Sequence, residues 1–192
     1  MGRRILLIQG HPDPEPGHFG HALADAYAEG AAAAGHAVRR VEVARLAFPL
    51  LRSAEDWRRG EPPAAIAGVQ GDMRWADHLV LLYPLWLGTM PAVTKAFLEQ
   101  MLRQSFAFGD DPERPRRALR GRSARVVVTM GMPAWVYRGW FRAHSLKSLE
   151  RNILRFCGVA PVRASLVGAV EGTPRRRERW LRRMRRHGRR AR

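Results

Sequence analysis

Residues 77–91 read DHLVLLYPLWLGTMP, and this stretch decides how the rest of the chain is interpreted. Its first half is a short, continuous apolar run, which is typical of a strand buried on both faces of a parallel sheet. Bulky apolar residues continue past Pro84, and Pro91 can open a helix because proline is tolerated at a helix start. The stretch therefore predicts a strand over Asp77–Tyr83, a loop, and a helix over Pro91–Leu102.

The same alternation of apolar runs and helical periods recurs on both sides of this stretch. Further strands are predicted at Arg4–Gln9, Val38–Val43, Arg125–Met130 and Ala164–Val170. Further helices are predicted at Gly20–Ala34, at His144–Cys157 with Leu146, Leu149, Ile153 and Phe156 facing the core, and around Arg177–Arg186. Because parallel strands need right-handed crossovers and helices must cover both faces, we expect an α/β fold with a doubly wound, five-stranded parallel sheet of order 2-1-3-4-5.

Length and composition are those of one soluble domain. The 192 residues suffice for a single core, and we expect a domain over residues 1–174 followed by a basic helix and tail over 175–192. No apolar run approaches the ~20 residues that cross a bilayer, and the short apolar start reads as a first strand. Cys157 is the only cysteine, which excludes an internal disulfide and a cysteine-based metal cluster. We expect a cytoplasmic protein.

The formal net charge of +17 is concentrated at one end of the chain, where residues 175–192 hold eleven arginines and a single acid. We do not expect nucleic-acid binding, because no aromatic residues are interleaved as a base-stacking platform and no zinc-finger or RNA-binding signature is present. We expect a solvated basic helix that packs at most through Trp180, Leu181 and Met184 and frays beyond His187. Docking of this tail on a membrane or a channel protein stays open.

The first candidate site is the loop GHPDPEPGHFG, residues 10–20, between the first strand and the first helix. Its three prolines make it rigid, and Gly17 frees the backbone where the unpaired amides of the helix begin. Such amides and the helix dipole attract an anion, and His11 and His18 can add donors. The loop therefore predicts a phosphate site.

Two other interpretations of this loop stay open. It can be a proline-rich surface turn, and Asp13 and Glu15 oppose a phosphate unless they point outward. A metal site from His11, His18 and His21 is not expected, because no cysteine or carboxylate stands at a known ligand spacing.

The second and third loops place apolar and aromatic residues where the same ligand would lie. In residues 83–91, Trp86 and Leu87 are costly to expose, and a planar heterocycle lying against them would bury both surfaces. The alternative is that they complete the core or a dimer interface. In residues 129–137, backbone amides beside Gly131 can stabilise negative charge on a reduced ring. Tyr137 and His144 can add hydrogen bonds, although ordinary packing or exposure explains them equally well.

With these loops in order, the chain resembles the NAD(P)H:quinone oxidoreductase family of flavoproteins with a flavodoxin-like fold. The segments that carry the resemblance are ILLIQGHPDPEPGHFGHALA, ADHLVLLYPLWLGTMPAVTKAFLEQ, VVVTMG and NILRFCGV. The resemblance implies non-covalent FMN or FAD, two-electron hydride transfer from NADH or NADPH to a quinone-like acceptor, and a homodimer with sites near the subunit interface.

The resemblance also assigns site residues. It implies that His11, His18 and Phe19, next to Gly17, meet the flavin phosphates. It implies that the ring is met by Pro84, Leu85, Trp86, Leu87 and Gly88, and its pyrimidine edge by Thr129, Met130 and Gly131. Tyr137 and His144 fall near the family's acid–base pair. The chain departs from the family at His18 and Gly20, which replace a serine and an asparagine, and at Leu87, which replaces an aromatic residue.

Other functions are compatible with the same topology. A flavodoxin-like electron carrier, or a regulatory flavoprotein docking on a membrane channel, is the alternative function. A signalling receiver is disfavoured because Gln9, Gly10 and His11 supply no acids for Mg²⁺. The G-x-G-x-x-G fingerprint is absent, so the dinucleotide is expected as a transient substrate stacked on the flavin.

Overall fold

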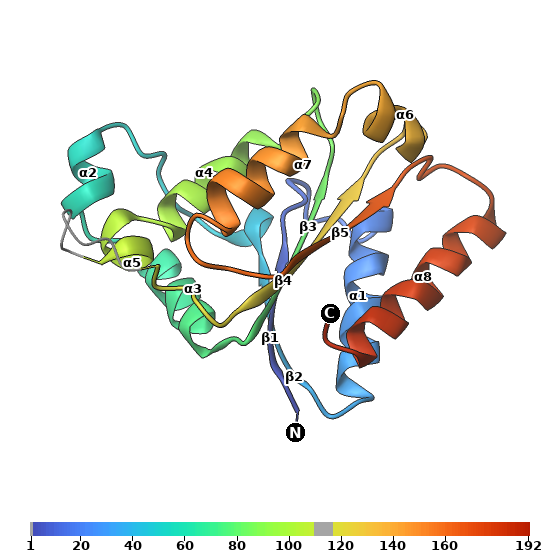
Figure 1. Cartoon of the computed structure of the whole chain (residues 1–192), viewed down its shortest axis with the longest axis horizontal. Helices are drawn as coiled ribbons and strands as arrows, with labels where there is room; N and C mark the ends of the chain where they lie inside the picture. The colour runs from blue at the N-terminus through green and yellow to red at the C-terminus, as the bar shows by residue number, and fades with distance from the viewer. Residues whose placement is uncertain (1, 110–116) are drawn as a thin grey trace.

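A five-stranded, all-parallel sheet forms the centre of the protein (Figure 1), with strand order β2-β1-β3-β4-β5. The computed structural model describes residues 2–109 and 117–192. The strands are β1 (Arg4–Gln9), β2 (Ala37–Glu42), β3 (His78–Pro84), β4 (Ser123–Thr129) and β5 (Val162–Val167). The sheet predicted from the sequence is confirmed in its class, its strand order and its parallel pairing.

Helices cover both faces of this sheet. One face carries α1 (Phe19–Ala32) and α8 (Pro174–Arg189), and the other carries α3 (Ala64–Trp75), α4 (Ala92–Met101) and α7 (His144–Ser148) (Figure 1). Shorter helices are η1 (Val43–Arg45), α2 (Ala54–Arg59), α5 (Gln104–Phe108) and α6 (Ala134–Gly139). Within the described residues, no helix has both the length and the apolar character that a bilayer span requires.

The two faces of the central strands bury different cores because successive side chains of a strand point to opposite sides. Leu6 and Ile8 of β1 belong to the larger apolar cluster beneath α3, α4 and α7. Ile5 and Leu7 belong to a smaller cluster beneath α1 and α8. Strands β3 and β4 are buried along their whole length, as their continuous apolar sequences predicted.

The predicted helix over His144–Cys157 is divided, and the prediction of its buried face is wrong in part. It consists of α7 followed by a π-helical segment, η2 (Leu149–Leu154). A π-helical turn holds more residues than an α-helical one, so the side chains beyond it are shifted in phase. Phe156, predicted as core, is 58% exposed, whereas Leu154 and Cys157 are buried.

The basic helix α8 packs more closely than the sequence predicted. Gly188 is buried, and a Cβ at this position would lie 2.0 Å from the carbonyl oxygen of Tyr27. The same holds for Gly30 of α1, where a Cβ would lie 2.0 Å from the carbonyl oxygen of Arg185. The two glycines let the backbones of α1 and α8 touch. The expected fraying beyond His187 is therefore wrong, since the helix continues to Arg189 and Ala191 is buried.

Candidate functional site

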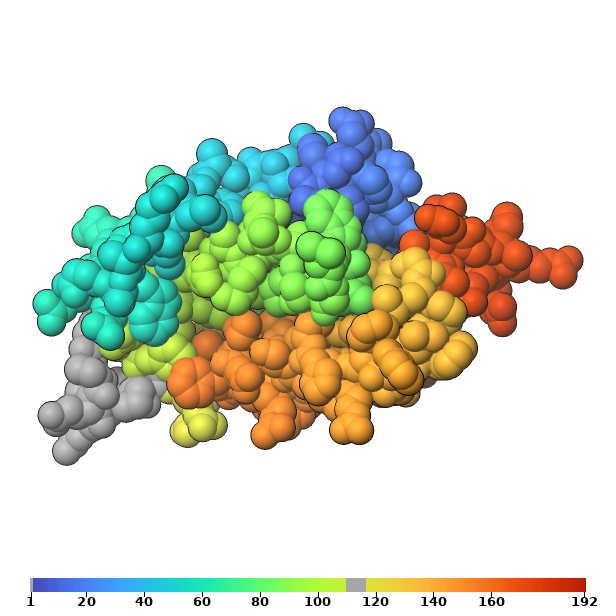
Figure 2. Space-filling model, turned by 90° about the horizontal axis from the view of Figure 1, so that it is seen from above, coloured from blue at the N-terminus to red at the C-terminus, as the bar shows by residue number. Residues whose placement is uncertain are grey.

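The loops after β1, β3 and β4 meet at the carboxyl edge of the sheet. The N–H of Gly10 donates to the carbonyl of Leu82 (2.7 Å), and the N–H of Leu85 donates to the carbonyl of Thr129 (2.7 Å). A Cβ at Gly10 would lie 2.8 Å from Cγ2 of Thr94, so only glycine fits this junction. Figure 2 shows the blue, green and yellow-orange segments of these three loops side by side on one surface.

In the first loop, His11 is buried and oriented by its neighbours. Nδ1 of His11 lies 3.0 Å from the carbonyl oxygen of Asp13 and 3.1 Å from its backbone nitrogen, so it has a partner in either tautomer of the neutral ring. Burial lowers the pKa of His11 more than its hydrogen bond with the backbone of Asp13 raises it. The ring is therefore neutral at pH 7.

The acid that the sequence prediction required to point outward, Asp13, points into the loop. Its Oδ2 lies 2.7 Å from Nε2 of His18, and its Oδ1 accepts from the backbone N–H of Glu15 (2.9 Å). These two hydrogen bonds lower the pKa of the Asp13 carboxyl, that from Glu15 more strongly. The His18 ring stacks on His11 with centroids 4.0 Å apart. The Asp13 carboxylate therefore occupies Nε2 of His18, while Glu15 is exposed.

The helix that follows begins with free donors. His18 is its N-cap residue and caps no backbone amide with its side chain, and the first turn contains no acid. The space beside Gly17 is open, with no atom within 4 Å of an added Cβ. Oε1 of Gln9 is buried nearby without a hydrogen-bond partner among the described residues. Phe19 itself is buried beneath Arg177, whose guanidinium lies 4.7 Å from the ring centroid, so Phe19 can meet a ligand only through its backbone.

The second loop is a tight hairpin that presents apolar side chains. Trp86 and Thr89 exchange two backbone hydrogen bonds (2.8 and 2.9 Å), and the residues between them, Leu87 and Gly88, have φ angles of 45° and 80°. Two successive positive φ angles are typical of a type I′ turn, which leucine rarely occupies. Leu87 is fully exposed and Trp86 is 51% exposed. The preceding Pro84 is buried and Leu85 half-buried, so neither presents its side chain as these two do.

The third loop contributes backbone more than side chains. Of its three residues assigned to the flavin, Thr129 and Met130 are buried, and only Gly131 is exposed. Tyr137 is buried as well, and its hydroxyl lies 2.7 Å from Oγ of Ser145. His144 is exposed.

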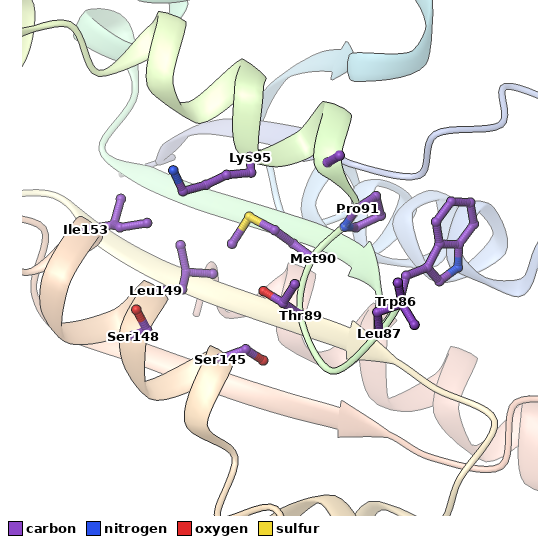
Figure 3. A pocket seen from close by; sticks show the side chains of 11 residues that line it. Trp86, Leu87, Thr89, Met90, Pro91, Lys95, Ser145, Ser148, Leu149 and Ile153 are labelled. Carbon is purple, nitrogen blue, oxygen red and sulfur yellow. The ribbon is translucent and has the colours of Figure 1, made fainter. Parts of the chain in front are cut away.

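Beside the second loop lies an apolar cavity of about 570 Å³ between α4 and the α7–η2 segment (Figure 3). Its lining comprises Trp86, Leu87, Thr89, Met90, Pro91, Ala92, Lys95, Ser145, Ser148, Leu149 and Ile153. Of the residues that the sequence assigned to the site, only Trp86 and Leu87 line this cavity. Tyr137, His144 and the remaining assigned residues of the three loops do not line it. Lys95, Ser145 and Ser148 also line it and were not predicted from the sequence; a four-residue helical spacing from Pro91 and from Leu149 was the available signal for Lys95 and Ser145.

No group of three or more histidine, cysteine or acidic side chains within residues 2–109 and 117–192 is arranged to hold a metal ion. In the first loop the three histidines contact one another, Asp13 and Gln9.

The fold is that of a doubly wound α/β protein, and the candidate site lies where the strand order reverses, between β1 and β3, the usual place of a ligand in such sheets. A family model described as the flavodoxin-like fold matches residues 3–188, and the chain belongs to this family.

Relatives identified by sequence carry names of flavin or nicotinamide enzymes. The chain is 25% identical over 177 residues to a ribosyldihydronicotinamide dehydrogenase-like protein, traD, of Penicillium crustosum, a match covering 78% of this chain and 63% of that protein. It is 33% identical over 70 residues to an FMN-dependent NADH:quinone oxidoreductase of Ruegeria pomeroyi, covering 36% of this chain and 34% of that one. The matched regions span less than two thirds of the length of these relatives.

Solved structures agree over nearly the whole chain. The structure resembles an NAD(P)H:quinone oxidoreductase from Methanothermobacter marburgensis with a TM-score of 0.82 and 25% identity, covering 98% of this chain and 96% of that one. A putative quinone reductase from Klebsiella pneumoniae, at 22% identity, has a TM-score of 0.82 and covers 97% of this chain and 83% of its own. The latter likeness supports the fold.

Proposed function

We propose that the protein binds a flavin, FMN or FAD, non-covalently at the three loops, and that it transfers hydride from NADH or NADPH to a quinone-like acceptor. The observation that carries this proposal is the meeting, at one edge of the sheet, of a helix start with free donors, two exposed apolar side chains and an apolar cavity. The names of the relatives in sequence and structure support it.

The residues of the first loop fit a flavin phosphate. Backbone amides at the start of α1 supply donors, the ring of His11 lies next to this helix start, and the open space beside Gly17 leaves room for an anion. Nε2 of His18 lies 2.7 Å from the Asp13 carboxylate, so this nitrogen is not free to contact a phosphate. The departures from the family at His18 and Gly20 thus leave the phosphate to backbone donors and to His11.

The second and third loops fit the two ends of a planar ring. Trp86 and Leu87 offer apolar surface to its face, and the exposed backbone at Gly131 offers donors to its polar edge. A bound flavin supplies the two-electron chemistry, while the protein positions the reactants and excludes water.

The cavity between α4 and α7 fits the acceptor. Its volume of about 570 Å³ and its apolar lining are those of a small-molecule site. Three hydroxyl residues, Thr89, Ser145 and Ser148, line it, and the hydroxyl of Tyr137 forms a 2.7 Å hydrogen bond with that of Ser145. We propose that this pair orients the acceptor and holds a proton at Oγ of Ser145. A direct role for His144 stays a prediction.

We also propose that the protein acts as a homodimer in the cytoplasm. Trp86, Leu87, Trp140 and Phe141 are exposed around the site, and a second copy would bury them. Burial raises the pKa of the single cysteine, Cys157, to about 12, so this thiol is inert and suits a reducing compartment. Light scattering on the purified protein measures the mass in solution, and a monomer at micromolar concentration would contradict the dimer.

The proposed activity is tested on the purified full-length protein. Its visible spectrum and the released flavin identify the cofactor, and anaerobic addition of NADPH is expected to bleach the flavin without a partner reductase. Subsequent addition of a quinone is expected to restore the colour. A flavin that NADH and NADPH cannot reduce would favour an electron carrier, and a protein that takes up no flavin would refute the proposal.

A matched pair of variants tests the phosphate site. His11→Ala removes the buried ring and is expected to weaken flavin binding about tenfold, the worth of one hydrogen bond to a charged group. Glu15→Gln removes an exposed charge from the same loop and is expected to leave flavin binding unchanged or slightly tighter. Fluorescence titration of the apoprotein measures both. Equal affinities of His11→Ala and the unmodified protein would place the phosphate elsewhere.

A further inference from the structure

Strand β5 leaves one edge of the sheet open. The carbonyls of Pro161 and Val167 accept from Ala124 and Met130 on the β4 side (both 2.9 Å), so residues 161, 163, 165 and 167 direct their backbone groups toward β4. The intervening Ala164 and Leu166 direct their N–H and C=O groups away from the sheet. Within the described part of the chain, no hydrogen bond occupies these outward groups.

This open edge lies in a groove of about 510 Å³. Ala164, Ser165 and Leu166 belong to its lining, together with side chains of α6 and α7 on one side and Trp180 and Arg183 of α8 on the other. Figure 1 shows β5 at the end of the sheet, between the orange helices α6 and α7 and the red helix α8. The groove is separate from the cavity of the proposed active site, which has no lining residue in common with it.

The groove is strongly cationic. Arg138, Arg142, Lys147 and Arg183 line it, and none of the four forms an ion pair with a carboxylate among the described residues. Its one acid, Glu150, is paired with Arg155 at 2.5 Å. The apolar part of the lining includes Leu146, Leu166 and the aromatic side chains of Trp135, 76% exposed, and Trp180.

We propose that this groove binds an extended acidic peptide, which pairs with Ala164 and Leu166 and adds to β5 as a sixth strand. Three features select this partner. The outward N–H and C=O groups form the ladder that an added strand needs. The four unpaired cations complement carboxylates, and Leu146, Leu166 and the two tryptophans receive the alternate side chains of a strand. A polynucleotide would use the cations and tryptophans but would leave the strand edge unpaired.

The test uses the flavin-loaded full-length protein and a fluorescein-labelled peptide of alternating glutamate and valine. Fluorescence anisotropy is expected to show saturable binding, and a peptide of alternating lysine and valine is expected not to bind. Amide hydrogen exchange on the unmodified protein is expected to show new protection at Ala164 and Leu166 when the acidic peptide is present. Bound peptide without this protection would overturn strand pairing.

Variants separate the two sources of binding. Ala164→Pro removes an outward N–H while sparing the hydrogen bonds to β4, and it is expected to lower the affinity for the acidic peptide about tenfold or more. The double reversal Arg138→Glu with Arg183→Glu is expected to do the same through charge. The matched control, Arg58→Glu with Arg175→Glu, makes the same change of net charge on exposed residues outside the groove. It is expected to lower the affinity for the acidic peptide much less than the groove reversal does.

Each variant is first compared with the unmodified protein in circular dichroism and flavin content, so that misfolding is recognised. A short oligothymidine serves as the competing probe. If it binds more tightly than the acidic peptide, and Ala164→Pro leaves its binding intact, the groove takes nucleic acid and the proposal is wrong. The proposal is also wrong if the control reversal weakens the acidic peptide as strongly as the groove reversal.

Discussion

The two faces of the sheet are built differently, and the difference separates what holds the fold together from what leaves room for a ligand. On the face covered by α1 and α8, glycines bring two backbones into contact, and polar groups are buried, including His78 and Arg125. On the face covered by α4 and α7, the side chains that the strands direct inward are apolar, buried polar groups such as Gln100 and Arg103 lie on the helix side, and the core opens into the cavity. A close-packed face fixes the strands, whereas the other face can admit an acceptor without disturbing them.

Truncating one large side chain on each face is the strongest test of this comparison. Met184 of α8 and Leu149 of η2 are both fully buried, but only Leu149 borders the cavity. Met184→Ala is expected to lower the free energy of unfolding by about 4 kcal/mol, and Leu149→Ala by about 2 kcal/mol, because a side chain beside an existing hollow loses fewer contacts. Urea denaturation measures both, and equal losses would erase the distinction between the faces.

The contact between α1 and α8 predicts the next largest effect. Gly188→Ala places a Cβ against the backbone of Tyr27, which cannot move aside as the end of a flexible side chain can. We therefore expect the free energy of unfolding to fall by about 3 kcal/mol. The control is Gly71→Ala on α3, where an added Cβ meets nothing within 4 Å and helix propensity predicts a gain of about 0.5 to 1 kcal/mol. If Gly188→Ala leaves the free energy of unfolding unchanged, α8 does not pack directly on α1.

The buried polar groups of the α1 and α8 face predict a pH dependence. Burial, aided by Arg3 and Arg125, lowers the pKa of His78 to about 3, from about 6.5 in the unfolded chain. Between these values the unfolded chain binds more protons, so stability is complete above pH 6.5 and falls on acidification, by about 1.4 kcal/mol per pH unit for this ring. His78→Asn is expected to flatten the curve between pH 6.5 and 4.5, and an unchanged slope would exclude His78 as its source.

The smallest expected effect lies at the rim of the open face. Leu87 has a positive φ and a fully exposed side chain, so Leu87→Gly relieves backbone strain of about 1 kcal/mol. The greater chain entropy of glycine in the unfolded state offsets only part of this gain. We expect stability to rise by about 0.5 kcal/mol while turnover with a quinone falls, because the ring loses its apolar neighbour. Calorimetry and steady-state kinetics measure the two, and a variant that gains stability and keeps full turnover would remove Leu87 from the site.

The sequence predicted the sheet well because β3 and β4 are continuous apolar runs, which suit only a strand that is buried on both faces. It predicted the convergence of the three loops, since strand order alone determines which strand ends meet. It could not predict that Asp13 turns toward His18, because the choice between inward and outward depends on hydrogen bonds that form only in the folded loop.

The lining of the cavity was also beyond prediction from the sequence. Ser145 and Lys95 lie fifty positions apart in the chain and meet only because α7 packs opposite α4. The contact of α8 with α1 was missed for a related reason. Gly30 and Gly188 look like helix-weakening residues in isolation, and their use becomes visible only when the two backbones are placed together.

The π-helical turn at Leu149–Leu154 divides what a regular helix would present as one stripe. Before the turn, Ser145 and Ser148 border the large cavity; Asn152 within the turn and Cys157 after it border a second hollow of about 140 Å³. Ile153 and Lys95 belong to both hollows. One widened turn thus borders two neighbouring compartments, and the side chains of Ile153 and Lys95 form the wall that the two have in common.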